Sequence, residues 1–242
     1  MSSADFYATL AGRYDELFGT SEDGLQFLRE EGARAGRRVL DVACGTGAWV
    51  RRLARESVDV YGVDLSTEMI ERGRAIARSE GVDPNRLSAG DMMEIDAHSR
   101  GPFDLVYCIG NSIAHLAAVD EVRGFVAATA DALRVGGTVV LQYVTVSGLT
   151  VGEEFELPSL SATGATMRRI YRRLGPSDIE FAAVLEIAGE PPRSISQRLL
   201  VMDDGAMLEA LHAAGFASTE LYSGFDRSPV DAAWVRVARG RL

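Results

Sequence analysis

The sequence contains no lysine: all 25 of its basic residues are arginine, and 35 acidic residues give a net charge of −10. Chemistry that needs a lysine amine, such as a Schiff base to a cofactor, is therefore excluded. The acidic balance also argues against nucleic acid as the main partner, because phosphate backbones select basic surfaces. It places no limit on small-molecule substrates.

Cysteine is almost as scarce, since only Cys44 and Cys108 occur. Their spacing offers neither a metal site nor a disulfide framework. Both fall at predicted strand ends, where a free cysteine behaves as a small buried apolar residue. We expect both thiols to be reduced and the protein to be cytoplasmic.

Signals for a membrane or for secretion are also lacking. The N-terminus has no basic start followed by an apolar run, as a signal peptide would. No apolar stretch reaches the roughly 18 residues needed to cross a bilayer. We therefore expect no membrane partner.

What the sequence does contain is an alternation of short apolar runs and helical patterns between residues 38 and 144. Strands are expected at 38–43, 58–63, 86–89, 103–109 and 138–144, and helices at 48–56, 66–79 and 119–133, the last stopping at Gly136-Gly137. This alternation predicts an α/β fold with a mostly parallel sheet and right-handed crossovers.

The flanking regions follow other patterns. Two helices, 5–18 and 23–35, are expected to form an N-terminal helical cap over residues 1–36. Beyond residue 150, strand patterns without intervening helices predict an antiparallel insertion over about 150–202. We interpret the whole chain, 1–242, as one domain. The expected elements here are strands 165–173, 179–187 and 194–201, a helix over 204–214, and last strands at 218–222 and 233–237.

The strongest local signal is VLDVACGTGAWV, residues 39–50. A strand ends, two glycines turn the chain, and a helix begins, so Gly45 and Gly47 allow a ligand to approach the backbone closely. A tight turn without a ligand is the simpler alternative. The dinucleotide fingerprint requires a third glycine where Val50 stands, which disfavours NAD.

Acidic residues follow the next two strands. Asp64 ends the strand YGVD, 17 residues beyond Gly47, where a carboxylate can accept hydrogen bonds from ribose hydroxyls; Leu65 follows it. Its alternative role is that of a neighbour of the helix cap at Ser66. Asp91 and Met92, just past the third strand, are candidates for the adenine amino group and ring, and an acidic surface loop is the alternative.

These motifs, DVACGTG, the strand ending in Asp64 and GDM, resemble class I S-adenosylmethionine-dependent methyltransferases over residues 37–145. The resemblance implies a Rossmann-like sheet of seven strands with one antiparallel strand near its edge. It implies S-adenosylmethionine as cofactor and S-adenosylhomocysteine as product. It also implies that the turn, with Ala43, Cys44, Gly45 and Gly47, lines the methionine part of the cofactor.

The stretch FDLVYCIGNSIAHL, residues 103–116, is similar to the glycine and sarcosine N-methyltransferases. The similarity implies that Ile109 and Gly110 lie against the cofactor, that Asn111 reaches toward the substrate nitrogen or the methyl centre, and that His115 stands near the methionine end. We take Asn111 and His115 as candidate catalytic residues. Their alternative roles are those of a helix N-cap and a helix-start histidine.

The chain departs from that group after the fifth strand, where an arginine that holds the amino-acid carboxylate is replaced by Val144 in an ungapped alignment. Glycine is therefore a doubtful substrate. Tyr7 and Tyr14 of the first helix are expected either to cover the cofactor or to serve packing. Candidates to replace the missing arginine are Arg168, Arg169, Arg172, Arg173 and Arg198 of the insertion.

The sequence thus predicts a small-molecule methyltransferase that needs no metal, with N-methylation favoured slightly over O-methylation. An amine acceptor needs alignment, and an alcohol or phenol needs a base, for which His115 is the candidate. The alternatives are an amino-sugar N-methyltransferase with a similar VACGTG motif, a small-molecule O-methyltransferase, a non-enzymatic cofactor-binding protein and an NAD-linked oxidoreductase. The acceptor is not identified, and homo-oligomer formation is left open.

Overall fold

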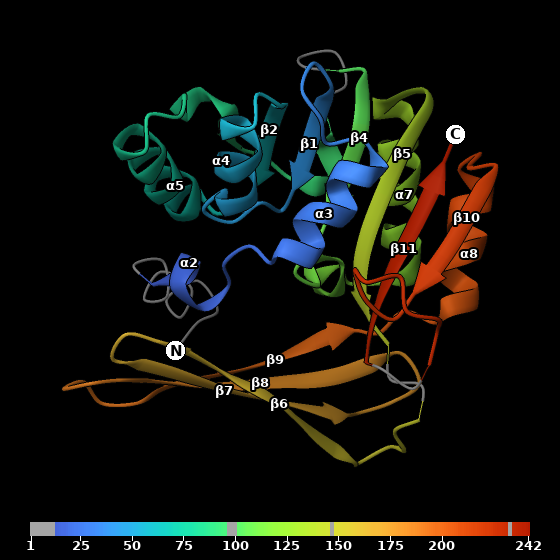
Figure 1. Cartoon of the computed structure of the whole chain (residues 1–242). Coiled ribbons are helices and arrows are strands. Elements are labelled where there is room, and N and C mark those ends of the chain that lie inside the picture. The colour runs from blue at the N-terminus through green and yellow to red at the C-terminus, as the bar shows by residue number, and fades with distance from the viewer. Residues whose placement is uncertain (1–12, 96–100, 146–147, 232–233) are drawn as a thin grey trace.

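The structure of the chain is a computed structural model that describes residues 13–95, 101–145, 148–231 and 234–242. It contains two sheets, which lie one above the other in Figure 1. No helix of the described segments is long and apolar enough to cross a membrane.

The larger sheet, here called the main sheet, has seven strands in the order β10-β11-β5-β4-β1-β2-β3. Only β11 runs against its neighbours, pairing antiparallel with both β5 and β10. The predicted Rossmann-like sheet with one antiparallel strand near the edge is therefore confirmed. Its strands are β1 (Arg38–Val42), β2 (Asp59–Asp64), β3 (Leu87–Ala89), β4 (Phe103–Cys108), β5 (Leu133–Val144), β10 (Ser218–Tyr222) and β11 (Val235–Arg241).

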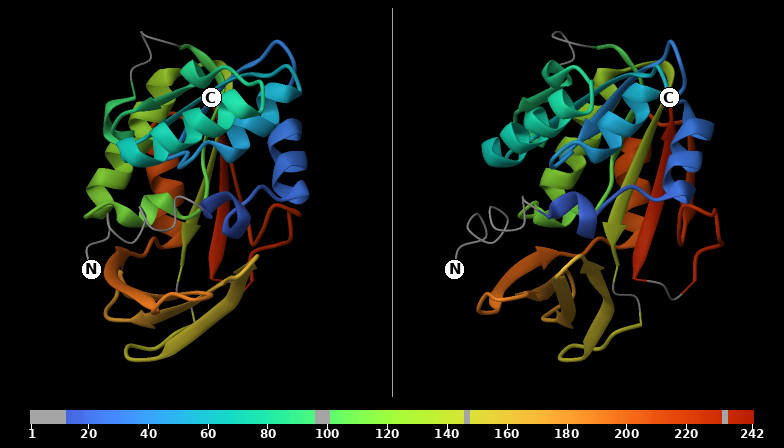
Figure 2. Two further views of the ribbon diagram at one scale, coloured as in Figure 1. Left: turned by 90° about the vertical axis from the view of Figure 1, so that its left-hand side faces the viewer. Right: turned by 60° about the vertical axis from the view of Figure 1, so that its left-hand side comes forward.

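Helices cover both faces of the main sheet, as the near-continuous apolar strands require. Helices α3, α4 and α5 lie on one face, and α7 and α8 lie on the other (Figures 1 and 2). The helices are α2 (Tyr14–Leu17), α3 (Glu22–Glu31), α4 (Ala48–Arg55), α5 (Thr67–Ser79), α7 (Val119–Ala132) and α8 (Asp204–Ala213), with short 3₁₀ turns η1 (Pro84–Arg86), η2 (Met92–Glu94) and η3 (Ser112–His115).

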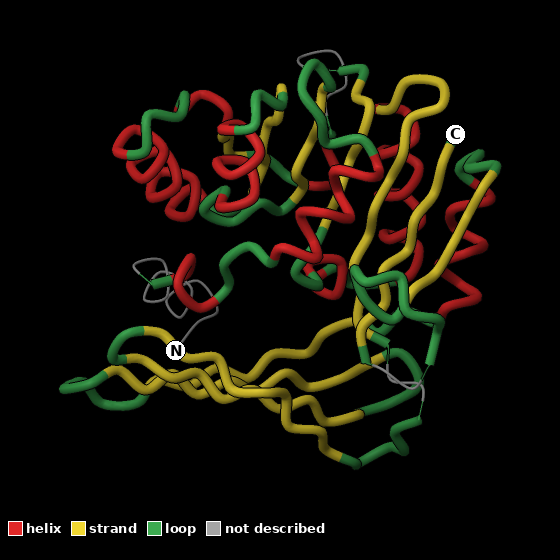
Figure 3. Tube along the Cα trace, in the orientation of Figure 1, coloured by secondary structure: helices red, strands yellow, loops and turns green. Residues whose placement is uncertain are grey.

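The second sheet, sheet B, is an antiparallel meander of four strands. It lies across the carboxyl end of β5, with its strands directed across those of the main sheet (Figure 3). One of its faces forms an apolar cluster with Leu17 of α2 and Val144 of β5, so sheet B and α2 close over the same edge of the main sheet. Its strands are β6 (Glu154–Ala162), β7 (Ala165–Arg173), β8 (Asp178–Ile187) and β9 (Arg193–Leu200).

Several predicted boundaries were wrong. Strand β6 was not predicted as part of the meander, because Pro158 breaks its strand pattern. The pairing of β6 with β7 shifts register between Leu157 and Leu160, and this irregularity accommodates the proline. Helix α7 ends at Ala132, because β5 begins at Leu133 and passes through Gly136 at φ +75°. Helix α3 ends at Glu31, four residues early, and β11 continues to Arg241. The part of the predicted first helix before residue 13 lies outside the described residues.

Candidate functional site

The glycine turn between β1 and α4 has an unusual backbone. Ala43, Gly45 and Gly47 all take positive φ, at +59°, +57° and +73°. A Cβ on Gly45 would stand 3.1 Å from the Tyr14 ring, and one on Gly47 would stand 2.4 Å from Leu87. Gly45 therefore makes room for the N-terminal segment, whereas Gly47 permits close packing of the turn against β3.

A charged cluster fixes α2 on this turn. Asp15 accepts hydrogen bonds from the Thr46 hydroxyl and from the guanidinium of Arg51. Arg51, whose side chain is only 5% exposed, also donates to the Thr46 carbonyl and, over 2.9 Å, to Glu80. A buried arginine with all these partners holds α2, α4 and α5 in one arrangement around the turn.

Asp64, at the end of β2, binds the same turn. One carboxylate oxygen accepts from the Gly45 N–H at 2.7 Å, and the other accepts from the Ser66 N–H at 2.8 Å. Ser66 in turn caps α5 by accepting from the Met69 N–H. Each carboxylate oxygen has two acceptor positions, so both retain capacity for a ligand donor.

The residues predicted to hold an adenine ring lie farther along this edge. Asp91 caps η2 by accepting from the Met93 N–H at 2.9 Å, and Met92 is half-buried. Leu65, next to Asp64, is 75% exposed. Exposed Leu65 and half-buried Met92, beside Asp64 and Asp91, form a surface that suits a planar ring with polar groups at its edge.

The end of β4 forms a second turn with positive φ. Gly110 and Asn111 take φ of +85° and +64°, after which η3 begins. The Gly110 N–H donates to the side chain of Gln142 on β5 at 2.7 Å. Asn111 stands at the N-cap position of η3 but makes no cap hydrogen bond, and its Oδ1 is buried without a partner among the described residues. A non-glycine residue in this conformation with an unpaired oxygen is typical of a functional position.

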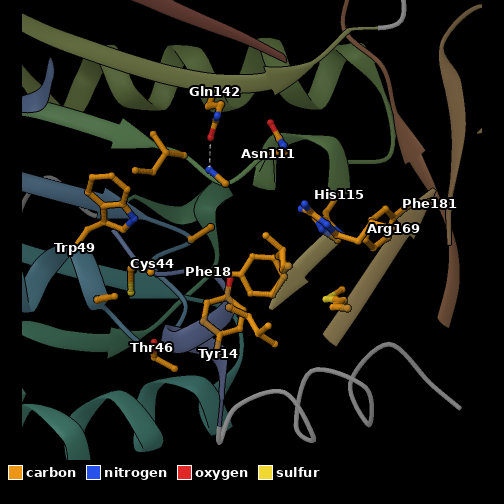
Figure 4. A pocket seen from close by; sticks show the side chains of 18 of the residues that line it. Tyr14, Phe18, Cys44, Thr46, Trp49, Asn111, His115, Gln142, Arg169 and Phe181 are labelled. Atoms are coloured by element: carbon orange, nitrogen blue, oxygen red, sulfur yellow. Dashed lines mark hydrogen bonds between the residues drawn. The ribbon is translucent and has the colours of Figure 1, made fainter. Parts of the chain in front are cut away.

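A pocket of about 360 Å³ lies between these two turns and sheet B. Figure 4 shows its wall passing from Trp49, Cys44 and Thr46 to Asn111 and His115, with Tyr14 and Phe18 on one side. The Tyr14 and Phe18 rings are 4.9 Å apart. Sheet B supplies the remaining wall, formed by Leu160, Met167, Arg169, Tyr171, Phe181, Gln197 and Leu199.

Among the titratable groups of the pocket, His115 and Asp41 have pKa values shifted by their surroundings. Partial loss of water lowers the pKa of His115, and the nearby Asp64 carboxylate offsets part of that fall. Burial raises the pKa of Asp41 well above its usual range, and the hydroxyl of Tyr107, its register partner on β4, opposes that rise. His115 is therefore neutral near pH 7 and available as a base, while Asp41 would gain from a cationic neighbour.

The pocket unites some of the residues singled out in the sequence. Its lining includes Tyr14, Ala43, Cys44, Ile109, Gly110, Asn111 and His115. The others lie along the adjoining edge and do not line it: Gly45, Gly47, Asp64, Leu65, Asp91 and Met92. Tyr7 lies outside the described residues. Within the described chain, no group of three or more His, Cys, Asp or Glu side chains could hold a metal ion.

Some lining residues were missed, namely Asp41, Thr46, Trp49, Gln142 and the sheet B wall. The first three lie inside or beside the glycine motif, so their position in the motif is the signal that could have found them. Val144, aligned with the missing arginine, is buried in the apolar cluster beneath sheet B and does not line the pocket. Of the five candidate arginines, only Arg169 lines it.

Comparison with known proteins agrees with this geometry. Residues 39–137 match the family described as "Methyltransferase domain". The glycine/sarcosine N-methyltransferase of Parasynechococcus marenigrum (strain WH8102) is 35% identical over 119 residues, which are 49% of this chain and 41% of that protein. The matches to the curated relatives span about half of their length.

Solved structures match nearly the whole chain. A methyltransferase from Streptomyces caelestis superposes with a TM-score of 0.80 at 22% identity, covering 98% of this chain and 97% of that one. An amino pentose methyltransferase from Micromonospora echinaspora, solved with S-adenosylmethionine bound, gives a TM-score of 0.69 at 26% identity, covering 100% and 98%. Residues 39–137 thus match a methyltransferase domain, in agreement with the predicted class I S-adenosylmethionine-dependent methyltransferase, and nearly the whole chain shares the fold of solved methyltransferases.

Proposed function

We propose that this protein transfers a methyl group from S-adenosylmethionine to a small-molecule acceptor, with a nitrogen as the favoured nucleophile. The observation that carries the proposal is the continuous pocket that joins the glycine turn to the turn at Asn111 and His115. In an open α/β sheet, ligands bind beyond the carboxyl ends of the strands, which is where both turns lie.

The residues present fit the cofactor. Asp64 would accept from the ribose hydroxyls, and Leu65, Asp91 and Met92 would hold the adenine ring. The turn at Ala43, Cys44, Gly45 and Gly47 would surround the methionine part, with Ile109 and Tyr14 against it. Asp41 supports this assignment, because a neighbouring ammonium would favour the charged form of a carboxyl whose pKa burial raises.

When bound, S-adenosylmethionine supplies an electrophilic methyl group on a sulfonium. The task of the protein is then to align a nucleophile and to exclude water. The unpaired Asn111 Oδ1 can accept from an amine N–H and so orient the nitrogen lone pair. Neutral His115 can take the proton that the nucleophile loses, which matters most for an alcohol or phenol. These two side chains are therefore the proposed catalytic residues.

Sheet B, in this proposal, is the substrate side of a single domain that is completed by the N-terminal cap. Similarity to a glycine/sarcosine N-methyltransferase and to an amino pentose methyltransferase supports a small amine as acceptor. An amino sugar is the second candidate within the class, and an O-directed reaction the third. Two free, buried cysteines support a reducing, cytoplasmic setting.

Calorimetric titration tests the cofactor assignment. S-adenosylmethionine and S-adenosylhomocysteine should bind, and NADH should not. Amines, amino sugars and phenols can then be screened by detecting released S-adenosylhomocysteine. Binding of NADH in preference to S-adenosylmethionine would reject the proposal.

A further inference from the structure

One arginine of sheet B points into the pocket rather than to solvent. On β7, alternate residues Ala165, Met167 and Tyr171 are buried toward the molecule, and Arg169 lies in the same alternation. Figure 4 shows the Arg169 side chain beside Phe181 and on the same side of the pocket as His115. Its neighbour Arg168 is on the opposite face, exposed, and paired with Glu156 at 3.0 Å.

Arg169 lacks the partners that its neighbours have. Arg168, Arg172 and Arg198 each form an ion pair with a carboxylate of the same sheet. None of the described carboxylates forms an ion pair with Arg169. Within the described segments, its Nη2 donates to the Pro158 carbonyl at 2.8 Å, and its buried Nε has no partner there. Loss of water lowers the pKa of this guanidinium, which nevertheless stays charged.

The surroundings of Arg169 leave this charge uncompensated. Among the described residues, Asp41 is the only acidic residue that lines the pocket; it lies at the end of β1 in the main sheet and forms no ion pair with Arg169. The wall around Arg169 is mostly apolar, with Met167, Phe181 and Leu199. A half-buried cation in such a place is costly unless an anion arrives to pair with it.

We propose that Arg169 binds a carboxylate or phosphate group of the methyl acceptor, so that the acceptor is a small anion with an apolar body and a nucleophilic group. The proposal rests on the proposed function. A guanidinium recognises either anion through paired hydrogen bonds, and the free Nε–H supplies a donor that faces the pocket. The apolar wall would contact the body of the same molecule.

The test is calorimetric titration of the protein saturated with S-adenosylhomocysteine, using benzoate, phenyl phosphate and benzylamine as probes. We expect an anionic probe to bind about ten- to a hundredfold more tightly than benzylamine, the scale of a hydrogen bond to a charged group. Arg169→Met should remove this preference, and Arg169→Lys should restore part of it. Arg168→Met is the matched control on the same strand and should leave the preference unchanged.

Two results would overturn the inference: no preference for the anions in the wild-type protein, or a preference that survives in Arg169→Met. If Arg169→Met instead weakens binding of S-adenosylmethionine, the anion that it holds is the cofactor's own carboxylate. If S-adenosylhomocysteine does not bind at all, the proposed function fails. In that case, the same titrations with benzoate, phenyl phosphate and benzylamine on the ligand-free protein test whether Arg169 binds an anion.

Discussion

The two ends of the pocket differ in how their polar groups are satisfied. At the glycine turn, Asp64 accepts from two backbone N–H groups, and Asp15 binds both Thr46 and Arg51. At the opposite end, the Asn111 Oδ1 and the Arg169 Nε are buried without partners among the described residues. Hydrogen bonds within the protein hold the glycine turn in place, whereas the opposite end has unsatisfied polar atoms that a ligand would pair with.

In the proposed function, this difference separates recognition of a common cofactor from choice of an acceptor. A self-satisfied turn can bind the same cofactor in many enzymes, and variation in the other wall changes specificity. The match to the methyltransferase family model accordingly spans residues 39–137, which contain the turn but not sheet B, although solved structures share the fold over nearly the whole chain. Substitutions at the two ends should therefore have different effects.

The largest effect is expected at the turn. Gly45→Val should abolish measurable binding of S-adenosylmethionine, because a branched side chain opposes the φ of +57° and its Cβ would press on the Tyr14 ring. Calorimetry gives the affinity. Gly81→Val is the control: that glycine has φ +72° with nothing near its absent Cβ, so the variant should bind normally. Equal losses in both variants would mean that general destabilisation is the cause.

Next in size is the effect of His115→Asn, which depends on the acceptor. With a phenol acceptor, loss of a general base should lower kcat by roughly 10²–10⁴-fold. With an amine acceptor we expect a loss of less than about tenfold, since alignment dominates there.

The pH profile adds a separate measurement. Burial lowers the pKa of His115, so the neutral base persists to below its ordinary pKa and activity should fall only as the pH drops through that lowered value. His115→Asn should lose this acidic limb with a phenol acceptor. An unchanged limb would assign the titration to another group.

The next prediction concerns free glycine as a methyl acceptor. We expect its kcat/KM to stay below roughly 10⁴ M⁻¹s⁻¹. Buried Val144 offers no carboxylate contact, and glycine has no apolar body to cover the wall near Phe181. Steady-state kinetics with glycine and sarcosine provides the measurement. A higher value that disappears in Arg169→Met would show that Arg169 has replaced the missing arginine, and that the prediction was wrong.

The smallest effect is expected for Asp64→Ala, which should weaken S-adenosylmethionine binding by about 1.5–3 kcal/mol. The same carboxylate also holds the Gly45 and Ser66 N–H groups, so the melting temperature should fall as well. Asp64→Asn keeps one acceptor oxygen for the turn and separates the two losses. A folded Asp64→Ala protein with unchanged affinity would reject the ribose assignment.

The sequence predicted the main sheet and its turns because the signals there are local. A strand, a glycine pair and a helix follow one another within residues 39–50, and each dictates its own conformation. By contrast, the contact of Asp15 with Arg51 joins residues 36 positions apart, and no periodicity reveals such a pair. Strand β6 was missed because Pro158 is tolerated only through a register shift made with β7.

For the five arginines of the insertion, the sequence contained a signal that the prediction did not use, namely the alternation of residues along the strand. Strand alternation places Arg169 on the face of Ala165, Met167 and Tyr171, and Arg168 on the other. Five arginines were left as equal candidates because which face of sheet B meets the main sheet depends on the packing of Val144 and Leu17 beneath it. That packing is tertiary and cannot be derived from β7 alone.

The cluster at Arg51 has a consequence for how distant substitutions act. Arg51 connects Glu80, at the end of α5, with the Thr46 carbonyl and with Asp15 on α2. A ligand that binds only when α2 is packed against the glycine turn therefore also stabilises the contact between Arg51 and Glu80. By thermodynamic linkage, that contact in turn strengthens binding of the ligand. Glu80 does not line the pocket, yet removing its carboxylate should lower ligand affinity. The loss in binding free energy should equal the free energy by which bound ligand strengthens the contact between Arg51 and Glu80.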